Sequence, residues 1–114
     1  MSLTTFLETL KSNPETIEFQ DTMNVIEQLY TFRETAFSNG ALRNEAGQNN
    51  GSCKLFAFAK LQGLSASETL ACFGHYYRED VLAHPEGSDH QNIRNFMQSG
   101  WDGIEFEAAA LQEK

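Results

Sequence analysis

Apolar residues recur along the N-terminal third of this chain at the spacing of amphipathic helices. The first stripe consists of Leu3, Phe6, Leu7 and Leu10. Its i, i+3, i+4, i+7 pattern predicts a helix that ends before Asn13-Pro14. The second stripe consists of Met23, Ile26, Leu29, Tyr30 and Arg33. It predicts a helix that Asp21 caps and that fades over residues 32–34. Residues 16–19 between them are short and β-prone, so we expect a strand there.

The C-terminal half predicts three further helices. The helically spaced positions of the first are Cys53, Phe56, Ala57, Lys60, Leu61 and Leu64, with a stop near Gly63. Ser65 and Glu68 then form a capping-box pattern, which opens a longer helix that runs through residue 81 and closes before Pro85. The last helix is capped by Ser88 or Asp89, and its apolar positions are Ile93, Phe96, Met97 and Trp101. Gly100 suits the position just after its end.

Two features interrupt this helical pattern. Residues 38–52 are rich in glycine and asparagine and make the longest turn-forming segment of the chain, with Ser52 as a cap for the helix that follows. Long ordered loops in small domains tend to be functional. Residues 103–106 mirror residues 17–19, and the two segments could pair as a small antiparallel ladder. Together these elements predict a mainly helical α+β fold, a single domain spanning residues 1–114 with about five helices and one short antiparallel ladder.

Composition narrows the classes of partner. The 114 residues include 16 acidic and 8 basic side chains, which gives a formal net charge of -8. Such a charge disfavours duplex nucleic acid and anionic membrane surfaces, so neither is an expected partner. No apolar run is long enough for a membrane span or a secretory signal peptide, which makes a cytoplasmic location the default. Secretion through an uncleaved, polar N-terminal signal stays compatible with these residues.

The first candidate chemistry is that of a cysteine nucleophile. Cys53 follows Gly-Ser at a predicted helix start, where the helix dipole and the adjacent Lys54 would favour a thiolate. His90 could serve as its base, with Asp89 or Asn92 to orient the imidazole, which would make a hydrolase or transferase. The alternative is that Cys53 is a small buried hydrophobe on the apolar stripe and that His90 faces solvent.

The second candidate is an anion cradle in the Asn/Gly segment. Glycine and asparagine free the backbone to present N–H groups, and a helix N-terminus follows. Residues 39–64 also form the only segment with a net positive charge, since Arg43, Lys54 and Lys60 outnumber Glu45. We expect the ligand-binding residues to be Asn44, Asn49, Ser52, Lys54, Tyr76 and Arg94. If this segment and the last two helix N-termini converge, Cys53, Lys54, His90, Asn92 and Arg94 would share one cleft. The alternative is an ordered loop held by its own side-chain amides.

Metal binding is the third possibility. His75, His84, His90 and Asp89 could be ligands, but their spacing contains no tight cluster such as HExxH. Cys53 and Cys72 fit neither a CxxC pair nor a zinc-type spacing, and we expect both to be reduced thiols. We therefore predict no metal site and no cofactor.

Several of these elements together resemble the HopJ family. The resemblance rests on Asn39-Gly40, Asn44, Ala46-Gly47, Asn49, Gly51-Ser52-Cys53-Lys54, Thr69 to Gly74, Tyr76-Tyr77-Arg78, Asp89-His90, Asn92-Ile93-Arg94 and Gly100-Trp101. It covers essentially the whole chain. It implies a small protein named as a type III effector of plant-pathogenic bacteria, with no catalytic assignment and no cofactor.

The sequence therefore predicts an effector-like protein of unknown biochemical activity that binds a small anionic ligand or a protein partner. The alternative is a cysteine-dependent enzyme that uses Cys53 and His90.

Overall fold

The structure, a computed structural model, describes residues 1–114 and confirms a mainly helical α+β fold. Its five α-helices are α1 (Leu3–Ser12), α2 (Phe19–Leu29), α3 (Asn50–Gln62), α4 (Ala66–Ala71) and α5 (Gln91–Ser99). The 3-10 helices are η1 (Pro14–Thr16) and η3 (Gly100–Gly103), and η2 (Tyr76–Val81) is a π-helix. The strands are β1 (Tyr30–Phe32), β2 (Phe37–Asn39), β3 (Leu42–Asn44), β4 (Ile104–Phe106) and β5 (Leu111–Glu113).

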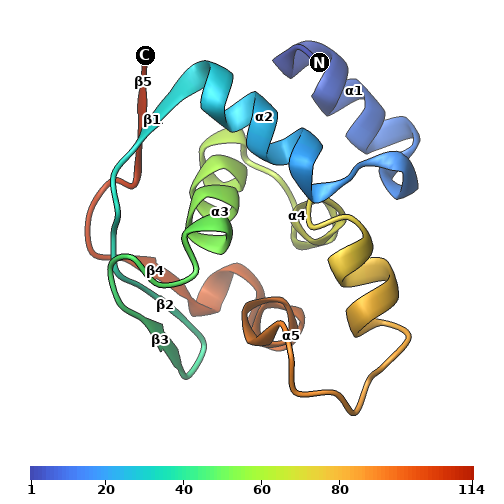
Figure 1. The fold of residues 1–114 in the computed structure, drawn as a ribbon, viewed down its shortest axis with the longest axis vertical. Helices are drawn as coiled ribbons and strands as arrows, with labels where there is room; N and C mark the ends of the chain where they lie inside the picture. The colour runs from blue at the N-terminus through green and yellow to red at the C-terminus, as the bar shows by residue number, and fades with distance from the viewer.

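Helix α3 is the centre of the molecule. In Figure 1 it lies inside a ring formed by α1 and α2, the strands, α5, and the α4–η2 segment. Its buried residues are Cys53, Leu55, Phe56, Ala57, Phe58 and Ala59, which point in all directions around the helix axis. The Phe56 ring contacts four other aromatic rings, those of Phe37, Phe73, Phe96 and Trp101. A single apolar stripe was therefore the wrong expectation for this helix, because a central helix is covered on every side.

The predicted ladder is half correct. Residues 104–106 do form a strand, but β4 pairs antiparallel with β2, which itself pairs with β3. A separate two-stranded ladder joins β1 to β5. Residues 16–19 are not a strand, because Pro14 starts the turn η1 and Glu18 already serves as the N-cap of α2. Asp21 is not that cap; it lies at the third helical position and accepts the backbone N–H of Glu18 at 3.0 Å.

The segment 38–52 is a hairpin followed by a helix start rather than one long loop. Gly40 has a φ of 62°, which supplies the left-handed residue that the turn between β2 and β3 needs. Ser52 does not cap α3, because the helix begins two residues earlier and Asn49 occupies the N-cap. Only residues 45–49 remain as a connection between β3 and α3.

The helix predicted from Ser65 to residue 81 is broken in two. Its start is correct, since Ser65 and Glu68 form the capping box of α4. The break occurs at Gly74, whose φ is 63°. A Cβ atom there would lie 2.8 Å from the Glu18 Cα and 2.7 Å from the Phe19 backbone nitrogen. The break thus lets the start of α2 dock directly onto the backbone at Gly74.

The last helix differs from its prediction mainly at its N-terminus. Neither Ser88 nor Asp89 caps α5; the N-cap is His90. Gly100 ends the helix with a positive φ, as expected. Trp101 lies beyond it in η3 and donates its indole N–H to the Leu64 carbonyl at 2.9 Å. No helix of the fold combines the length and the apolar composition that crossing a membrane requires.

Candidate functional site

A cleft of about 580 Å³ lies where the first turns of α3 and α5 meet. It brings together five of the residues that the sequence singled out. These are Asn49 and Ser52 from the start of α3, Tyr76 from η2, and His90 and Asn92 from the start of α5. Phe19, Phe73 and Leu42 complete its apolar walls. The Asn/Gly segment was expected to meet the last two helix N-termini; in the fold it meets the start of α5, whereas the start of α4 does not line this cleft.

Both helices that meet at the cleft have open N-termini. Their N-caps, Asn49 and His90, have φ values of 52° and 50°, and neither side chain bonds to its own helix. The backbone N–H groups of Gly51, Ser52 and the first turn of α5 have no acceptor within the protein. A left-handed residue followed by a right-handed one also forms the concave N–H arrangement known as a nest, which favours anions. The cleft therefore offers two sets of free donors.

Acidic side chains are missing from the first turns of these two helices. The third helical position holds Ser52 in α3 and Ile93 in α5. In α2 and α4 the same position holds Asp21 and Glu68, whose carboxylates accept the N-cap backbone N–H groups. A negative charge at a helix N-terminus is stabilised by the positive end of the helix dipole. The first turns of α3 and α5 contain no acidic residue. Glu34 contacts the Asn50 side-chain amide at 3.1 Å and Asp80 contacts the His90 ring at 3.0 Å, and neither carboxylate accepts a backbone N–H of these helices.

A cluster of asparagine amides holds the two open helix ends together. Asn39 from β2, Asn44 from β3 and Asn92 from α5 are all buried. The side-chain carbonyl of Asn92 accepts hydrogen bonds from the side-chain amides of Asn39, at 3.0 Å, and Asn44, at 3.2 Å. Asn92 in turn donates to the Asn44 carbonyl at 3.0 Å, which also accepts from Asn49 at 2.8 Å. Asn44 is thus a framework residue that does not line the cleft, and Asn92 lines the cleft with its side-chain amide already engaged in this cluster.

Asn39 was not among the expected site residues, because Asn39-Gly40 has the ordinary pattern of a turn. It is fully buried, and its amide also donates to the Asn92 backbone carbonyl at 2.8 Å. Its own carbonyl oxygen is the one buried side-chain polar atom without a hydrogen-bond partner. The signal in the sequence is the recurrence of asparagine at positions 39, 44, 49 and 92, which hydrophobic patterning does not detect.

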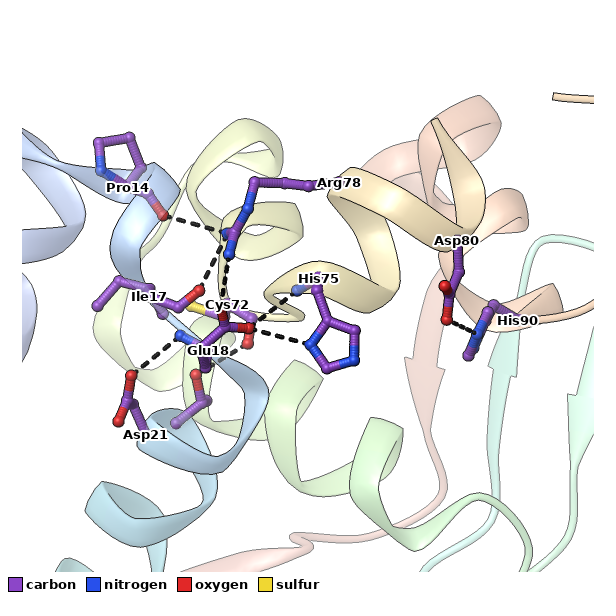
Figure 2. A network of polar contacts seen from close by, with 10 residues as sticks. Pro14, Ile17, Glu18, Asp21, Cys72, His75, Arg78, Asp80 and His90 are labelled. Carbon is purple, nitrogen blue, oxygen red and sulfur yellow. Dashed lines mark hydrogen bonds and ion pairs between the residues drawn. The ribbon is translucent and has the colours of Figure 1, made fainter. Parts of the chain in front are cut away.

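His90 and Asp80 form a polar pair beside the cleft (Figure 2). The His90 Nε2 lies 3.0 Å from the Asp80 Oδ2. The His90 ring centroid lies 5.3 Å from that of Tyr76. Asp80 and Tyr76 both belong to η2, and π-helical turns occur often at functional sites. Asp80 was not predicted, because a continuous α-helix through residue 81 gives no reason to relate it to His90.

The π-helix is fixed to α2 by a second polar network, which Figure 2 also shows. The Glu18 carboxylate accepts from the His75 backbone N–H at 3.1 Å and pairs with Arg78 at 3.1 Å. Arg78 donates in addition to the Ile17 carbonyl at 3.0 Å. The backbone N–H of His75, and then its side chain, hold the pKa of Glu18 below its usual range. This network anchors the segment that carries Tyr76 and Asp80.

Cys53 does not share the cleft with His90. Its side chain is 1% exposed, and its Sγ points to the Thr35 carbonyl oxygen at 3.5 Å. Burial raises the pKa of the Cys53 thiol to about 11, the opposite of what a nucleophilic thiolate requires. Cys72 is buried too, and desolvation raises its pKa to about 12. This geometry supports the interpretation of Cys53 as a small buried hydrophobe. It does not support an enzyme in which Cys53 is the nucleophile and His90 is its base.

The expected basic residues also lie outside the cleft lining. The Lys54 ammonium sits 5.0 Å from the centre of the Phe32 ring. Arg94 donates to the Asp89 carboxylate at 2.7 Å and to the His84 carbonyl at 3.0 Å, and its hydrogen bond holds the pKa of Asp89 low. Asp89 is thus bound to Arg94 rather than positioned to orient His90, from which it lies 3.9 Å away. Free backbone donors, not lysine or arginine, line this site.

The net positive charge of residues 39–64 is dispersed in the fold. Arg43 is paired with Glu45 and Glu107, and Lys60 lies over the Phe106 ring. The three histidines are separated as well: His75 contacts Glu18, His90 contacts Asp80, and His84 is exposed. Segment charge therefore pointed to a stretch of chain that lines the cleft, but the charged side chains themselves lie elsewhere.

Comparisons with known proteins extend over nearly the whole chain. The model of the family described as HopJ type III effector protein matches residues 3–111. A crystal structure described as that of unknown function protein VPA0580 is 60% identical and superimposes with a TM-score of 0.98. That match covers 100% of this chain and 95% of the other. No protein of curated function matches the chain.

Proposed function

Because the chain belongs to the family of HopJ type III effector proteins, we propose that it is an effector-like protein whose cleft binds a small organic anion. The observation that carries the proposal is the meeting of two uncapped helix N-termini, α3 and α5, in one cleft. A bound carboxylate or phosphate oxygen would accept the backbone N–H groups that have no partner in the protein. Delivery through a type III secretion system belongs to the same proposal and rests on the family description.

The lining indicates what kind of anion fits. Each helix end stabilises a negative charge by roughly 0.3–1 kcal/mol when exposed and up to about 2 kcal/mol when partly buried. No lysine or arginine lines the cleft, and Asp80 lies behind His90, so a singly charged group suits it better than a dianion. Phe19, Phe73 and Tyr76 supply aromatic surface on the other side. These contacts favour a carboxylate that carries a planar or apolar group.

Binding can be tested with sodium benzoate as the probe and inorganic phosphate as the doubly charged comparison. We expect benzoate to raise the melting temperature in proportion to the logarithm of its concentration, and to shift the amide NMR signals of residues 49–52 and 90–93. Phosphate should do so more weakly. No benzoate-dependent shift of these amides at millimolar concentration would refute the proposal.

The matched variants are Ser52→Glu and Ser67→Glu. The first places a carboxylate in the open first turn of α3 and should abolish benzoate binding. The second adds the same charge to the first turn of α4, whose end is already capped, and should bind benzoate as the unmodified protein does. Equal loss of binding in both variants would show that overall charge, not the open helix end, governs the interaction.

A further inference from the structure

The contact between His90 and Asp80 fixes the hydrogen-bonding roles of the imidazole. An ionised carboxylate has only acceptors, so the His90 Nε2 must carry the proton in the 3.0 Å contact with the Asp80 Oδ2. In the neutral ring the other nitrogen, Nδ1, is then left with a lone pair. A histidine whose tautomer is set by a carboxylate has the arrangement of a general base.

The surroundings of His90 hold this arrangement in place. Asp80 lies on η2, which the Glu18–His75–Arg78 network ties to α2. Asp89, on the other side, lies 3.9 Å from the same Nε2, but its carboxylate is engaged by Arg94 at 2.7 Å. His90 is itself the left-handed N-cap of α5, and its side chain is 30% exposed. The ring is therefore fixed by the backbone and by Asp80, while one side remains open to the cleft that it lines.

The cleft that His90 lines also holds backbone N–H groups without a hydrogen-bond partner. The backbone N–H groups of Gly51 and Ser52, and those of the first turn of α5, line the same cleft as His90. Pre-organised backbone donors of this kind stabilise the negative oxygen that forms when water attacks a carbonyl carbon. A histidine paired with a carboxylate and residues with unbonded backbone N–H groups thus line one cavity, which Cys53 does not line.

We propose that this cleft hydrolyses small carboxylic esters, with His90 as the catalytic general base and Asp80 as its positioning residue. The His90 Nδ1 takes a proton from water while the water oxygen bonds to the ester carbonyl carbon, and the carbonyl electron pair moves to the oxygen held by the backbone donors. When that pair returns, the bond to the alkoxy group breaks and His90 gives its proton to the leaving oxygen. The products are a carboxylic acid and an alcohol. The inference rests on the proposed function, because the acid formed is an anion of the class the cleft would bind.

The test measures hydrolysis of 4-nitrophenyl acetate by the full-length protein. We expect a rate that saturates with ester concentration, rises with pH through one ionisation, and is inhibited competitively by benzoate. His90→Asn should lower kcat by roughly 10²–10⁴-fold and remove the pH-dependent rise, because it removes the base. Asparagine tolerates left-handed backbone, so this variant should fold. His84→Asn is the matched control and should hydrolyse the ester at the unmodified rate.

Asp80→Asn tests the positioning role separately. It should lower kcat at least tenfold with little change in KM, while benzoate binding and the circular dichroism spectrum stay as in the unmodified protein. Hydrolysis that does not saturate, or that survives in His90→Asn, would overturn the inference. If benzoate still binds in that case, the proposed function stands without it; if benzoate does not bind, both fail.

Discussion

Helix N-termini in this protein are of two kinds: some are capped by side chains of their own first turn, and others have no side-chain cap. The starts of α2 and α4 are closed: Asp21 and Glu68 accept the N-cap N–H groups of Glu18 and Ser65. The starts of α3 and α5 are open: their N-caps are left-handed, no side chain caps them, and both face one cleft. Since capping is available elsewhere in the same chain, its absence at these two ends is the observation on which the proposed anion site rests.

The largest effect should come from breaking a closed end. Gly74→Ala places a methyl group against the Glu18 Cα and the Phe19 backbone nitrogen, in a left-handed conformation. We expect a loss of about 3 kcal/mol in the free energy of unfolding, from steric overlap added to backbone strain. Gly63→Ala is the control, because Gly63 has a φ of 67° and nothing within 4 Å. It should cost only about 1 kcal/mol. Equal losses in urea denaturation would contradict the packing argument.

The framework of the open ends should be the next most sensitive part. Asn92→Ala leaves the buried amides of Asn39 and Asn44 without the carbonyl that they share. We expect a loss of about 2 kcal/mol, the usual cost of unpaired buried polar groups. Asn95→Ala, on the same helix, removes only an exposed bond to the Gln91 carbonyl and should cost less than about 0.5 kcal/mol. The comparison fails if both variants unfold at the same urea concentration.

The free energy of unfolding should fall at alkaline pH, because the Cys53 thiol next to the open end of α3 is buried. Cys53 comes directly after the free donors but is buried, and its pKa is raised from 9.0 to about 11. The unfolded chain therefore loses this proton first, and the stability that the protonated thiol contributes is present below pH 9 and lost as pH rises through 11. We expect the fall in stability between pH 9 and 10 to be about 1 kcal/mol smaller in Cys53→Ala, where only Cys72, with its pKa raised to about 12, still contributes. An identical pH dependence in that variant would place the thiol in contact with solvent.

The smallest effect should come from closing an open end. Ser52→Glu gives α3 the acidic residue that α2 and α4 have at the same helical position. We expect a gain of about 0.5 kcal/mol in the free energy of unfolding at low salt, which high salt should remove. Ser67→Glu, beside Glu68, should bring no gain, because the α4 end is already compensated. Destabilisation by Ser52→Glu would mean that the end is not electrostatically open.

The sequence predicted the parts of the fold that depend on local signals. The Leu3–Leu10 stripe, the Ser65–Glu68 capping box and the stops at Gly63 and Gly100 are confirmed. The break at Gly74 was missed because its cause lies 56 residues away, in the backbone at Glu18. The partner of β4 was missed for the same reason, since strand pairing depends on distant residues rather than on local pattern.

The candidate site was predicted in its location more than in its chemistry. Asn49, Ser52, Tyr76, His90 and Asn92 meet at the cleft, whereas Lys54 and Arg94 are engaged elsewhere. Charged side chains are visible in a sequence, but free backbone donors are not, because they depend on how each helix begins. Asp80 became relevant only once the π-helix placed it beside His90.

The asparagine cluster has a consequence for the conditions under which the cleft keeps its shape. Amides neither gain nor lose protons in the ordinary pH range, so Asn39, Asn44, Asn49 and Asn92 form an uncharged support. Neither mild acid nor added salt acts directly on these bonds, unlike the Glu18–Arg78 pair on the far side. The asparagine support should therefore stay intact in mildly acidic or saline surroundings, so that the shape of the cleft does not depend on the charge state of the groups that hold it.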